Sequence, residues 1–358
     1  MPEYIPMREV THSDYKEFLK THDHVVIENV KVALPKEHKI TKFAPTEFEC
    51  TKCKARYRPK PPKICNCAMK ENLTPDEIKK LLELPNEKKF VLVEYEKETT
   101  TAWSFPDRGD WATHIGNYRG NWSPYIPRNL ILRYTKEGDL VLDQMVGSGT
   151  TLVECKLLGR RSIGVDINQD AIMVTRNRLD FSPPPDYTFP SGEKYQEPKI
   201  ETYEGDARNL NEVPDGKVDL IATHPPYASI IPYSKQRVPG DLSSVHDIAE
   251  FAKAMRIGAD QSYRKLRPGG HCAILMGDTR RHKHFVPITP RVLQSFLDAG
   301  FILREDIIKM QWKMKSTRER WRGKNYDFLL IAHEHLYVFR KPEKGEKMSQ
   351  FKESMKWQ

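Results

Sequence analysis

The chain has 358 residues, a formal net charge of +9 and 30% charged residues. This length allows one large domain with an accessory domain, and the positive charge favours a polyanionic partner such as nucleic acid. No apolar run reaches roughly 18 residues and no secretory leader is recognisable, so we expect a cytoplasmic protein without a membrane partner.

Residues 1–110 are expected to form an α+β accessory domain. The pattern predicts a helix over residues 14–21 and a strand over residues 25–32. A helix over residues 74–84 has a clear start, because Thr74 can cap it and the following proline suits its first turn. Residues 90–95 are predicted to form another strand.

Four of the six cysteines lie close together in this region, at Cys50, Cys53, Cys65 and Cys67. A C-x-x-C pair followed by a second close pair is typical of a structural zinc site with four thiolates. We therefore expect a zinc-ribbon-like module over about residues 48–69, with zinc as a structural cofactor. Disulfides in a hyperthermophile, free thiols and an iron–sulfur cluster are the alternatives.

The segment from Trp103 to Trp122 is rich in aromatic residues, with Phe105, Trp111 and Tyr118 between its ends. Aromatic residues commonly pack in a core, here between the two expected domains. Alternatively, part of the segment forms a rim that faces a base or a cofactor. Both interpretations stay open.

The stretch from Leu140 to Asp166 organises the rest of the chain. It predicts a strand, a glycine turn, a helix and a second strand, over residues 140–142, 146–149, 150–158 and 163–165. Asp143 follows the first strand and Asp166 ends the second. Glycines let the backbone approach a ligand, the helix turns its N-terminus toward it, and an acid after the second strand can accept ribose hydroxyls.

Two common nucleotide motifs are absent from this stretch. It contains no G-x-x-x-x-G-K-[ST], and the third glycine of the dinucleotide fingerprint is missing after Gly147 and Gly149. With Asp143 before the glycines and Asp166 after them, the arrangement resembles the S-adenosylmethionine (SAM) site of Rossmann-like methyltransferases. The alternative is a structural turn that binds no ligand.

A second stretch predicts the chemistry. Residues 218–222 have the pattern of a buried strand, and they lead into Thr223, His224, Pro225, Pro226 and Tyr227. Two prolines stop the strand and stiffen the backbone at the sheet edge where ligands of open α/β sheets bind. Such a loop can hold a planar exocyclic amine by its two hydrogens while the aromatic ring stacks on the base.

The remaining elements alternate as in an α/β domain. Helices are predicted over residues 171–179, 248–266 and 290–298, and strands over residues 200–203, 271–276, 307–314 and 335–339. Between the last two strands lies a basic loop with aromatic residues, which suits phosphate contacts and stacking on bases. Its candidate nucleic-acid contacts are Lys315, Arg318, Arg320, Trp321, Arg322 and Lys324. A solvated loop of a basic protein is the alternative.

Together, these residues resemble the DNA amino-methyltransferase family, which methylates N4 of cytosine or N6 of adenine. The family pattern is roughly D-P-F-x-G-S-G-T-T and [DNS]-P-P-[YF], and this chain reads D-Q-M-V-G-S-G-T-T and H-P-P-Y. The resemblance extends over about residues 121–339. It implies an α/β, Rossmann-like SAM-dependent methyltransferase domain with a seven-stranded, mostly parallel sheet over residues 111–345, followed by a tail at 346–358.

The resemblance also implies the roles of individual residues. Asp166 would hold the ribose and Asp206 would approach the adenine of SAM. The expected cofactor-binding set is Asp143, Met145, Gly147, Ser148, Gly149, Thr150, Asp166, Ile167, Asp206 and Ala207, and the catalytic set is His224, Pro225, Pro226 and Tyr227. The chain departs from the family where Gln144 and Met145 replace Pro-Phe, and where His224 replaces Asp, Asn or Ser.

These residues predict direct methyl transfer to an exocyclic amine without a covalent enzyme intermediate. His224 and the Pro225 carbonyl would accept the two amine hydrogens, and Tyr227 would stack on the base. A neutral His224 is required, so activity should fall as the pH drops through its pKa. Carbon-5 methylation is disfavoured, because neither Cys155 nor Cys272 follows a proline in a catalytic loop.

No large base-reading insertion separates the predicted elements, which favours recognition of structured RNA by shape, with ribosomal RNA as one candidate. Cytosine N4 is slightly favoured over adenine, and an archaeal, RNA-acting relative of the family is one expectation. Site-specific DNA methylation is the main alternative. Protein glutamine methylation and a SAM- and nucleic-acid-binding protein without transfer activity are the others, and the oligomeric state stays open.

Overall fold

The structure is a computed structural model that describes residues 7–21, 95–116, 118, 120–228, 238–312 and 327–356, with the backbone of four short strands between residues 24 and 57. Cys50, Cys53, Cys65 and Cys67 lie outside the described residues, as does the predicted helix over residues 74–84. The basic loop is also outside them, with Lys315, Arg318, Arg320, Trp321, Arg322 and Lys324.

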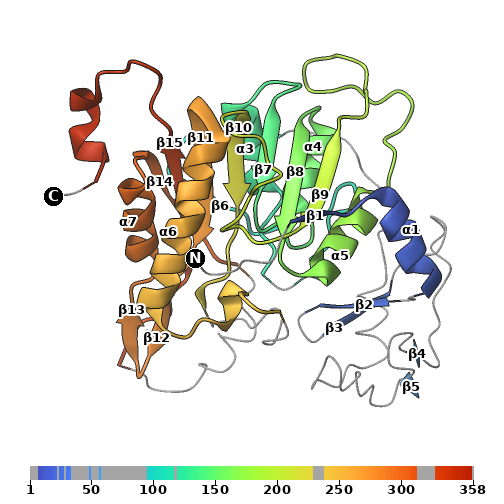
Figure 1. Ribbon diagram of the computed structural model, residues 1–358, viewed down its shortest axis with the longest axis horizontal. Coiled ribbons are helices and arrows are strands. Elements are labelled where there is room, and N and C mark those ends of the chain that lie inside the picture. Colours follow the sequence, from blue (N-terminus) through green and yellow to red (C-terminus); the bar gives the residue numbers. More distant parts are fainter. Residues whose placement is uncertain are drawn as a thin grey trace.

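Helices and strands alternate from α3 to β9, and Figure 1 shows all elements of the described chain. The helices are α1 (His12–Thr21), α3 (Tyr125–Tyr134), α4 (Thr150–Leu157), α5 (Gln169–Leu179), α6 (Ile248–Lys265) and α7 (Thr289–Asp298), with 3₁₀ turns η2 (Leu242–Ser244) and η3 (Met348–Ser354). The strands of the main sheet are β1 (Arg8–Glu9), β6 (Ala102–Ser104), β7 (Leu140–Asp143), β8 (Arg161–Asp166), β9 (Ile200–Glu204), β10 (Val218–Thr223), β11 (Leu266–Met276), β14 (Ile302–Met310) and β15 (His333–Arg340). Three two-stranded pairs are β2 (His24–Ile27) with β3 (Val30–Ala33), β4 (Phe48–Glu49) with β5 (Arg56–Tyr57), and β12 (Thr279–Arg281) with β13 (His284–Val286).

The main sheet has the strand order β1-β9-β8-β7-β10-β11-β15-β14-β6. The five strands from β9 to β11 are parallel, and β15 runs antiparallel to both of its neighbours. The chain reverses its direction of progress across the sheet between β7 and β10. In open α/β sheets this switch point is where ligands bind. The predicted Rossmann-like, mostly parallel α/β fold is therefore found.

The predicted count of seven strands is wrong for the main sheet, because two short edge strands extend it. β1 pairs antiparallel with β9, and β6 pairs parallel with β14, with Trp103 opposite Lys309. Both added strands come from the first 110 residues. The division at residue 110 remains a prediction, and the residues on either side of the interval 22–94 contribute to the main sheet.

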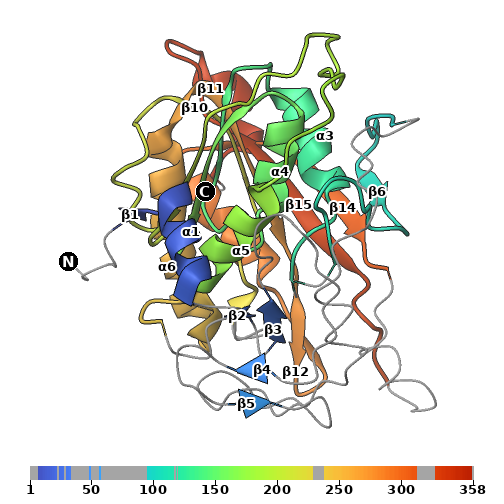
Figure 2. The same ribbon diagram turned by 90° about the vertical axis from the view of Figure 1, so that its right-hand side faces the viewer.

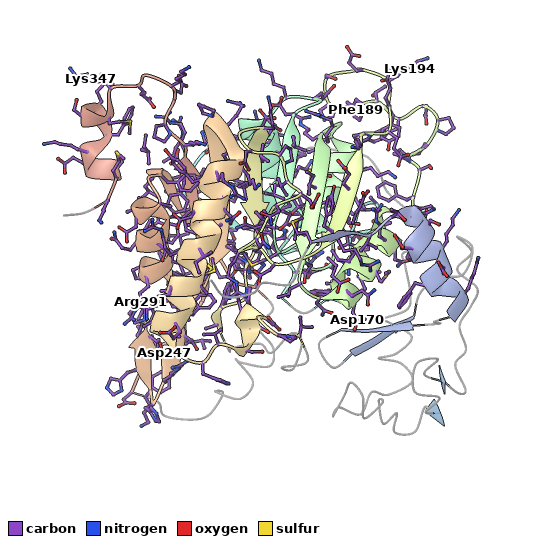
Figure 3. The ribbon with its side chains drawn as sticks, viewed as in Figure 1. Asp170, Phe189, Lys194, Asp247, Arg291 and Lys347 are labelled. Atoms are coloured by element: carbon purple, nitrogen blue, oxygen red, sulfur yellow. The ribbon has the colours of Figure 1, made fainter. Side chains whose placement is uncertain are left out.

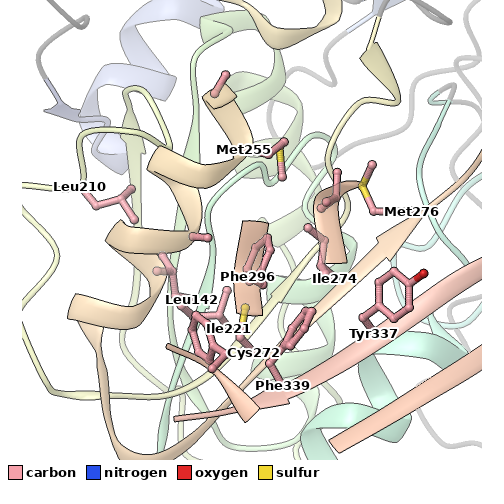
Figure 4. Close-up of a cluster of buried hydrophobic side chains, with 14 of the residues drawn as sticks. Leu142, Leu210, Ile221, Met255, Cys272, Ile274, Met276, Phe296, Tyr337 and Phe339 are labelled. Carbon is pink, nitrogen blue, oxygen red and sulfur yellow. The ribbon is translucent and has the colours of Figure 1, made fainter. Parts of the chain in front are cut away.

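Side chains alternate between the two faces of the sheet, as the twofold repeat of a strand requires. Leu142, Ile221 and Ile274 point into a core with α6 and α7, shown in Figure 4. Val141 and Leu220 point into the opposite core, which α3 and Trp103 complete. Figure 2 shows α6 on one side of the sheet and α3 and α4 on the other.

Three helices begin at the same edge of the molecule. Asn168 caps α5 and Asp247 caps α6 through side-chain oxygens that accept backbone N–H groups. Asp170, Asp247 and Arg291, near the starts of α5, α6 and α7, lie at this edge in Figure 3, whereas Phe189 and Lys194 lie at the other. The parallel strands end at the edge where these helices begin, so backbone donors and strand-end side chains meet there.

Most predicted elements are present with boundaries shifted by a few residues, but three differ in kind. The single strand predicted over residues 25–32 is a pair of antiparallel strands, β2 and β3. Helix α3 and the β12–β13 hairpin were not predicted. Among the described residues, no helix is long and apolar enough to cross a membrane.

Candidate functional site

A pocket opens at the switch point, where the carboxyl ends of β7, β8, β9 and β10 meet. Its empty volume is about 820 Å³ including its open mouth, within the range of small-molecule sites. The lining residues are Tyr118, Gly120, Asn121, Trp122, Asp143, Gln144, Met145, Val146, Gly147, Ser148, Thr150, Asp166, Ile167, Asn168, Asp206, Ala207, His224, Pro226, Gly240, Asp241 and Leu242.

The glycine loop between β7 and α4 forms the floor of this pocket. Gly147 and Gly149 have φ angles of 54° and 81°, which favour glycine, and Gly149 precedes the first residue of α4. A side chain at Gly149 would lie 2.9 Å from a methyl carbon of Thr175, so the loop and α5 pack without room for a Cβ. Thr175 also donates its hydroxyl to the Gly147 carbonyl at 3.0 Å.

Two aspartates at strand ends hold this loop. Asp166 accepts the backbone N–H of Gly147 and of Asn168, each at 2.9 Å. Asp143 accepts the Thr151 hydroxyl at 2.5 Å. Burial raises the pKa of Asp166 to about 7 and that of Asp143 to about 6, and the hydrogen bonds oppose this only in part. Strands β7 and β8 therefore end in carboxyl groups that are unusually easy to protonate.

Two further aspartates line the opposite rim. Asp206 follows β9 and forms a charge-assisted pair with Arg208, whose Nη2 lies 2.6 Å from Asp206 Oδ2 and 2.6 Å from the Gly240 carbonyl. Asp241 accepts the backbone N–H and the hydroxyl of Ser243 at 2.8 and 2.6 Å. Arg208 thus connects the loop after β9 to the segment that carries Asp241.

The tetrapeptide His224–Tyr227 follows β10 directly, and its residues His224 and Pro226 line the pocket. The His224 ring stacks on Trp122, with centroids 5.8 Å apart and planes at 20°. Burial lowers the pKa of His224 to about 4, so the ring is neutral at physiological pH. Pro225 is buried and Tyr227 is half-buried; neither lines the pocket, and the stacking role of Tyr227 stays a prediction.

Tyr227 instead takes part in a hydrogen-bonded cluster that extends to the next strands. Its hydroxyl lies 2.6 Å from His224 Nε2 and donates to Glu334 at 2.8 Å. Lys309 donates to the other oxygen of Glu334 at 2.8 Å. Glu334 and Lys309 were not predicted as functional residues, because β14 and β15 read as ordinary strands.

The fourth side of the pocket is formed by a strap, residues 111–122, of which all but 117 and 119 are described. Tyr118, Asn121 and Trp122 line the pocket, and Asn121 donates to the Ser148 hydroxyl at 3.3 Å. Trp111 is buried and donates to Glu154 on α4. The start of the aromatic segment therefore packs in the core and its end lines the pocket, and whether that end faces a base or a cofactor stays a prediction.

Three buried polar atoms at the pocket have no hydrogen-bond partner among the described residues: Gln144 Nε2, Thr150 Oγ1 and His224 Nδ1. A buried polar group without a partner is destabilising, so these atoms indicate a polar ligand. The Gly147–Thr150 loop, the strand-end acids and a pocket of this size fit the nucleoside and amino-acid parts of SAM. Where they are ionised, the carboxyl groups that line the pocket also suit its cationic sulfur.

The structure brings most of the predicted site residues together. Of the expected cofactor set, Asp143, Met145, Gly147, Ser148, Thr150, Asp166, Ile167, Asp206 and Ala207 line the pocket, and Gly149 belongs to its floor. Sequence reasoning offered residues 118–122 only as one of two interpretations of the aromatic segment, and it missed the rim at residues 240–242. Cys155 and Cys272 are fully buried away from the pocket, and burial raises the pKa of both thiols, consistent with their exclusion as nucleophiles.

Comparison with models of known protein families gives a match over most of the chain. A sequence model described as DNA methylase, for enzymes of the N6 and N4 type, matches residues 10–177 and 218–357. The match begins within the region predicted to be accessory, and it includes α1, the strap and every strand of the main sheet except β1 and β9.

Individual relatives match over shorter stretches. A tRNA (guanine(10)-N2)-dimethyltransferase from Methanothermobacter thermautotrophicus is 35% identical over 189 residues, 52% of this chain and 45% of that protein. The type II methyltransferase M2.DpnII from Streptococcus pneumoniae is 50% identical over 56 residues, 16% of this chain and 21% of that protein. The chain thus spans less than half the length of these relatives. Among solved structures, TrmN from Thermus thermophilus aligns with 18% identity and a TM-score of 0.39, covering 62% of this chain and 50% of that one.

Proposed function

Because the chain belongs to the N6/N4 DNA methylase family, we propose that it transfers the methyl group of SAM to the exocyclic amine of a nucleobase in nucleic acid. One observation carries the proposal: His224 and Pro226, directly after β10, line the same pocket as the glycine loop and Asp166. A methyl donor in that pocket and a planar amine at the tetrapeptide would meet at the end of β10.

In this proposal Asp166 accepts hydrogen bonds from the ribose hydroxyls, and Asp206 and Ala207 lie beside the adenine. Met145, Ser148, Thr150 and Ile167 complete the wall. SAM would supply a methyl group on a positively charged sulfur. The protein contributes orientation and a pocket whose carboxyl groups favour a cation, which are effects of position and electrostatics.

An exocyclic amine conjugated with a ring is a poor nucleophile, because its lone pair is delocalised. Two acceptors, His224 and the Pro225 carbonyl, would take its hydrogens and draw the nitrogen toward a tetrahedral geometry. The nitrogen then takes the methyl group in one displacement and its excess proton passes to an acceptor at the site. His224 is suited to this role because its ring is neutral.

We favour N4 of cytosine in structured RNA, such as ribosomal RNA, as the target. Among the described residues, the connections between β8, β9 and β10 contain no helix or strand beyond α5 that could form a base-reading domain, which supports recognition by shape. Methylation of cytosine or adenine in DNA is the alternative suggested by the relatives that are type II methyltransferases.

A second candidate is the N2 amine of guanine in tRNA. It is supported by the relative from Methanothermobacter thermautotrophicus, which matches over 52% of this chain. Guanine N2 is also an exocyclic amine with two hydrogens, so the same acceptors would serve it.

Nucleoside mass spectrometry tests these alternatives. The protein is incubated with methyl-deuterated SAM and with RNA or DNA from a strain that lacks its gene, and the nucleic acid is digested. We expect label in N4-methylcytidine from RNA. Label in N2-methylguanosine would support the second candidate, whereas label on a ring carbon or a ribose oxygen would contradict both.

We also propose that Cys50, Cys53, Cys65 and Cys67 hold one structural zinc ion, and that the basic loop of Lys315, Arg318, Arg320, Trp321, Arg322 and Lys324 contacts the nucleic acid. The spacing of the cysteines and the mixture of cations and an aromatic ring support these roles. Metal analysis should find about one zinc per chain. Folded, metal-free protein with all four thiols would contradict the zinc site.

A further inference from the structure

A row of four side chains leads from the interior of the sheet to the pocket. Lys309 on β14 and Glu334 on β15 face each other in the strand register and are joined at 2.8 Å. Glu334 accepts the Tyr227 hydroxyl at 2.8 Å, and the Tyr227 oxygen lies 2.6 Å from His224 Nε2. The side chains of Lys309 and Glu334 are only 16% and 9% exposed, so solvent hardly weakens their attraction.

The donors and acceptors in this row can be assigned by counting protons. Burial alone would raise the pKa of Glu334, but the charge of Lys309 and the hydrogen bonds to Lys309 and Tyr227 lower it below its ordinary value. Glu334 is therefore a carboxylate, which only accepts. Tyr227 has one hydroxyl proton and gives it to Glu334. Its oxygen can then only accept from His224, so Nε2 must carry the proton of the neutral ring.

We propose that the Lys309–Glu334 pair, acting through Tyr227, holds His224 in the tautomer that is protonated on Nε2 and leaves Nδ1 as the acceptor for the target amine. Nδ1 is buried and has no partner of hydrogen-bond geometry among the described residues. The Gly120 carbonyl also approaches the ring and would favour the opposite tautomer. That contact does not meet hydrogen-bond geometry, whereas both contacts of Tyr227 do.

The tautomer matters because the two forms offer opposite groups to the substrate. With the proton on Nε2, Nδ1 presents a lone pair toward an amine hydrogen. With the proton on Nδ1, the N–H group of the ring would point at an N–H group of the target amine, and the two groups would repel each other. This part of the inference rests on the proposed function. Lys309, Glu334 and Tyr227 are thus positioning residues, and His224 is the group that touches the substrate.

Packing restricts the Tyr227 ring to the position that this row requires. A Cβ placed on Gly277, just after β11, would lie 2.6 Å from a ring carbon of Tyr227, so the ring lies directly against the bare backbone. The His224 ring is held on its other side by Trp122. Neither aromatic ring can turn away without losing these contacts.

The tautomer can be read directly by NMR. Protein with ¹⁵N-labelled histidine gives two-bond ¹H–¹⁵N correlations that distinguish a proton on Nε2 from one on Nδ1. The His224 signals are those missing from a His224→Gln variant. We expect the proton on Nε2 in the native protein, and a proton on Nδ1 would overturn the inference whether or not any activity is found.

Glu334→Gln tests how the tautomer is set. Lys309 should take the amide oxygen of the introduced side chain, leaving its NH₂ group to donate to Tyr227. Tyr227 would then donate to His224 Nε2 and move the ring proton to Nδ1. We expect the altered NMR pattern and a fall in kcat of roughly 10²-fold or more, with the KM for SAM unchanged.

Two controls accompany this variant. Lys309→Arg keeps a cation at Glu334 and should retain most of the activity and the native NMR pattern. Glu346→Gln removes the carboxylate of a comparable ion pair with Arg340, away from the pocket, and should change neither readout. If Glu334→Gln leaves tautomer and kcat unchanged, the inference is wrong. If the native protein methylates no nucleic acid, the proposed function fails while the tautomer spectrum still decides this assignment.

Discussion

Glu154 and Glu334 are the centres of two buried clusters built from the same kinds of residue. Glu154 on α4 accepts from Trp111 at 2.7 Å, His114 at 2.6 Å and Arg128 at 2.9 Å. Glu334 accepts from Lys309 and from Tyr227. Each cluster thus contains a glutamate, a cation, an aromatic donor and a histidine.

The clusters differ in where the histidine is attached. His114 bonds directly to Glu154 and lies away from the pocket, whereas His224 is reached through Tyr227 and lines the pocket. Nδ1 of both rings lacks a partner among the described residues. An unpartnered atom alone therefore does not define a site; here the difference is that His224 lines a cavity and His114 does not. The first cluster fixes the strap to α4, and the second leaves an acceptor available.

The largest difference should appear in stability. Glu154→Gln leaves the Arg128 guanidinium buried without its carboxylate, so we expect a loss of about 3–5 kcal/mol in the free energy of unfolding. Denaturant unfolding followed by tryptophan fluorescence measures this. Glu250→Gln, which removes an exposed ion pair with Lys253, is the control and should change little. An equal effect of the two substitutions would mean that Glu154 is not the anchor of the strap.

The next largest effect should follow from displacing Tyr227 by packing alone. Gly277→Ala places a methyl group 2.6 Å from a ring carbon of Tyr227, which must move away from His224. We expect turnover to fall roughly 10²-fold, because displacements of about 1 Å can have that effect. Gly258→Ala, in a helix position with nothing within 4 Å, is the matched control. Unchanged turnover in the Gly277 variant would show that the position of Tyr227 does not matter.

A smaller effect is expected at Asp166, which belongs to neither cluster. Asp166→Asn removes a charged acceptor from the ribose, and SAM affinity measured by calorimetry should weaken about tenfold, corresponding to about 1.4 kcal/mol. Asp260→Asn, an exposed position paired with Arg256, should leave the affinity unchanged. A normal affinity in the Asp166 variant would remove this residue from the proposed site.

The smallest effect is a dependence on pH. The pKa of Asp166 is raised to about 7, so the carboxyl takes up a proton as the pH falls through that value. SAM affinity should therefore weaken several-fold between pH 8 and pH 6 and strengthen as the pH rises. The pKa of His224 is lowered to about 4, so turnover at saturating SAM should not fall near pH 6.5. An acid limb near 6.5 that His224→Asn removes would contradict this assignment.

Local motifs explain why much of the site could be predicted. The glycine loop, Asp143 and Asp166 lie within one short stretch, and the strand that ends at Thr223 places His224 at the ligand-binding edge. Strand alternation likewise predicts which residues of β7 and β10 are buried. These inferences need only nearby residues and the direction of a strand.

The remainder of the site depends on contacts that no local pattern contains. Tyr227 and Glu334 are 107 positions apart, and Trp111 and Glu154 are 43 apart. From sequence alone, a glutamate in a strand is predicted to face solvent, because its partner across the sheet is not known. The same holds for β6, whose three residues become a strand only because β14 offers an unpaired edge.

The pairing of β6 with β14 determines when β6 can fold during synthesis on the ribosome. Ser104, at the end of β6, accepts a hydrogen bond from Trp312, 208 positions later. At about 5–20 residues per second, β6 is made roughly 10–40 s before its partner strand. Until β14 is made, Ala102–Ser104 has no edge strand to join, and the core around Trp103 lacks Ile307 of β14 and Leu336 of β15. Although β6 is made early, it is therefore among the last strands of the main sheet to reach its native place, and nascent chains halted before β14 should expose Trp103 to proteases and chaperones.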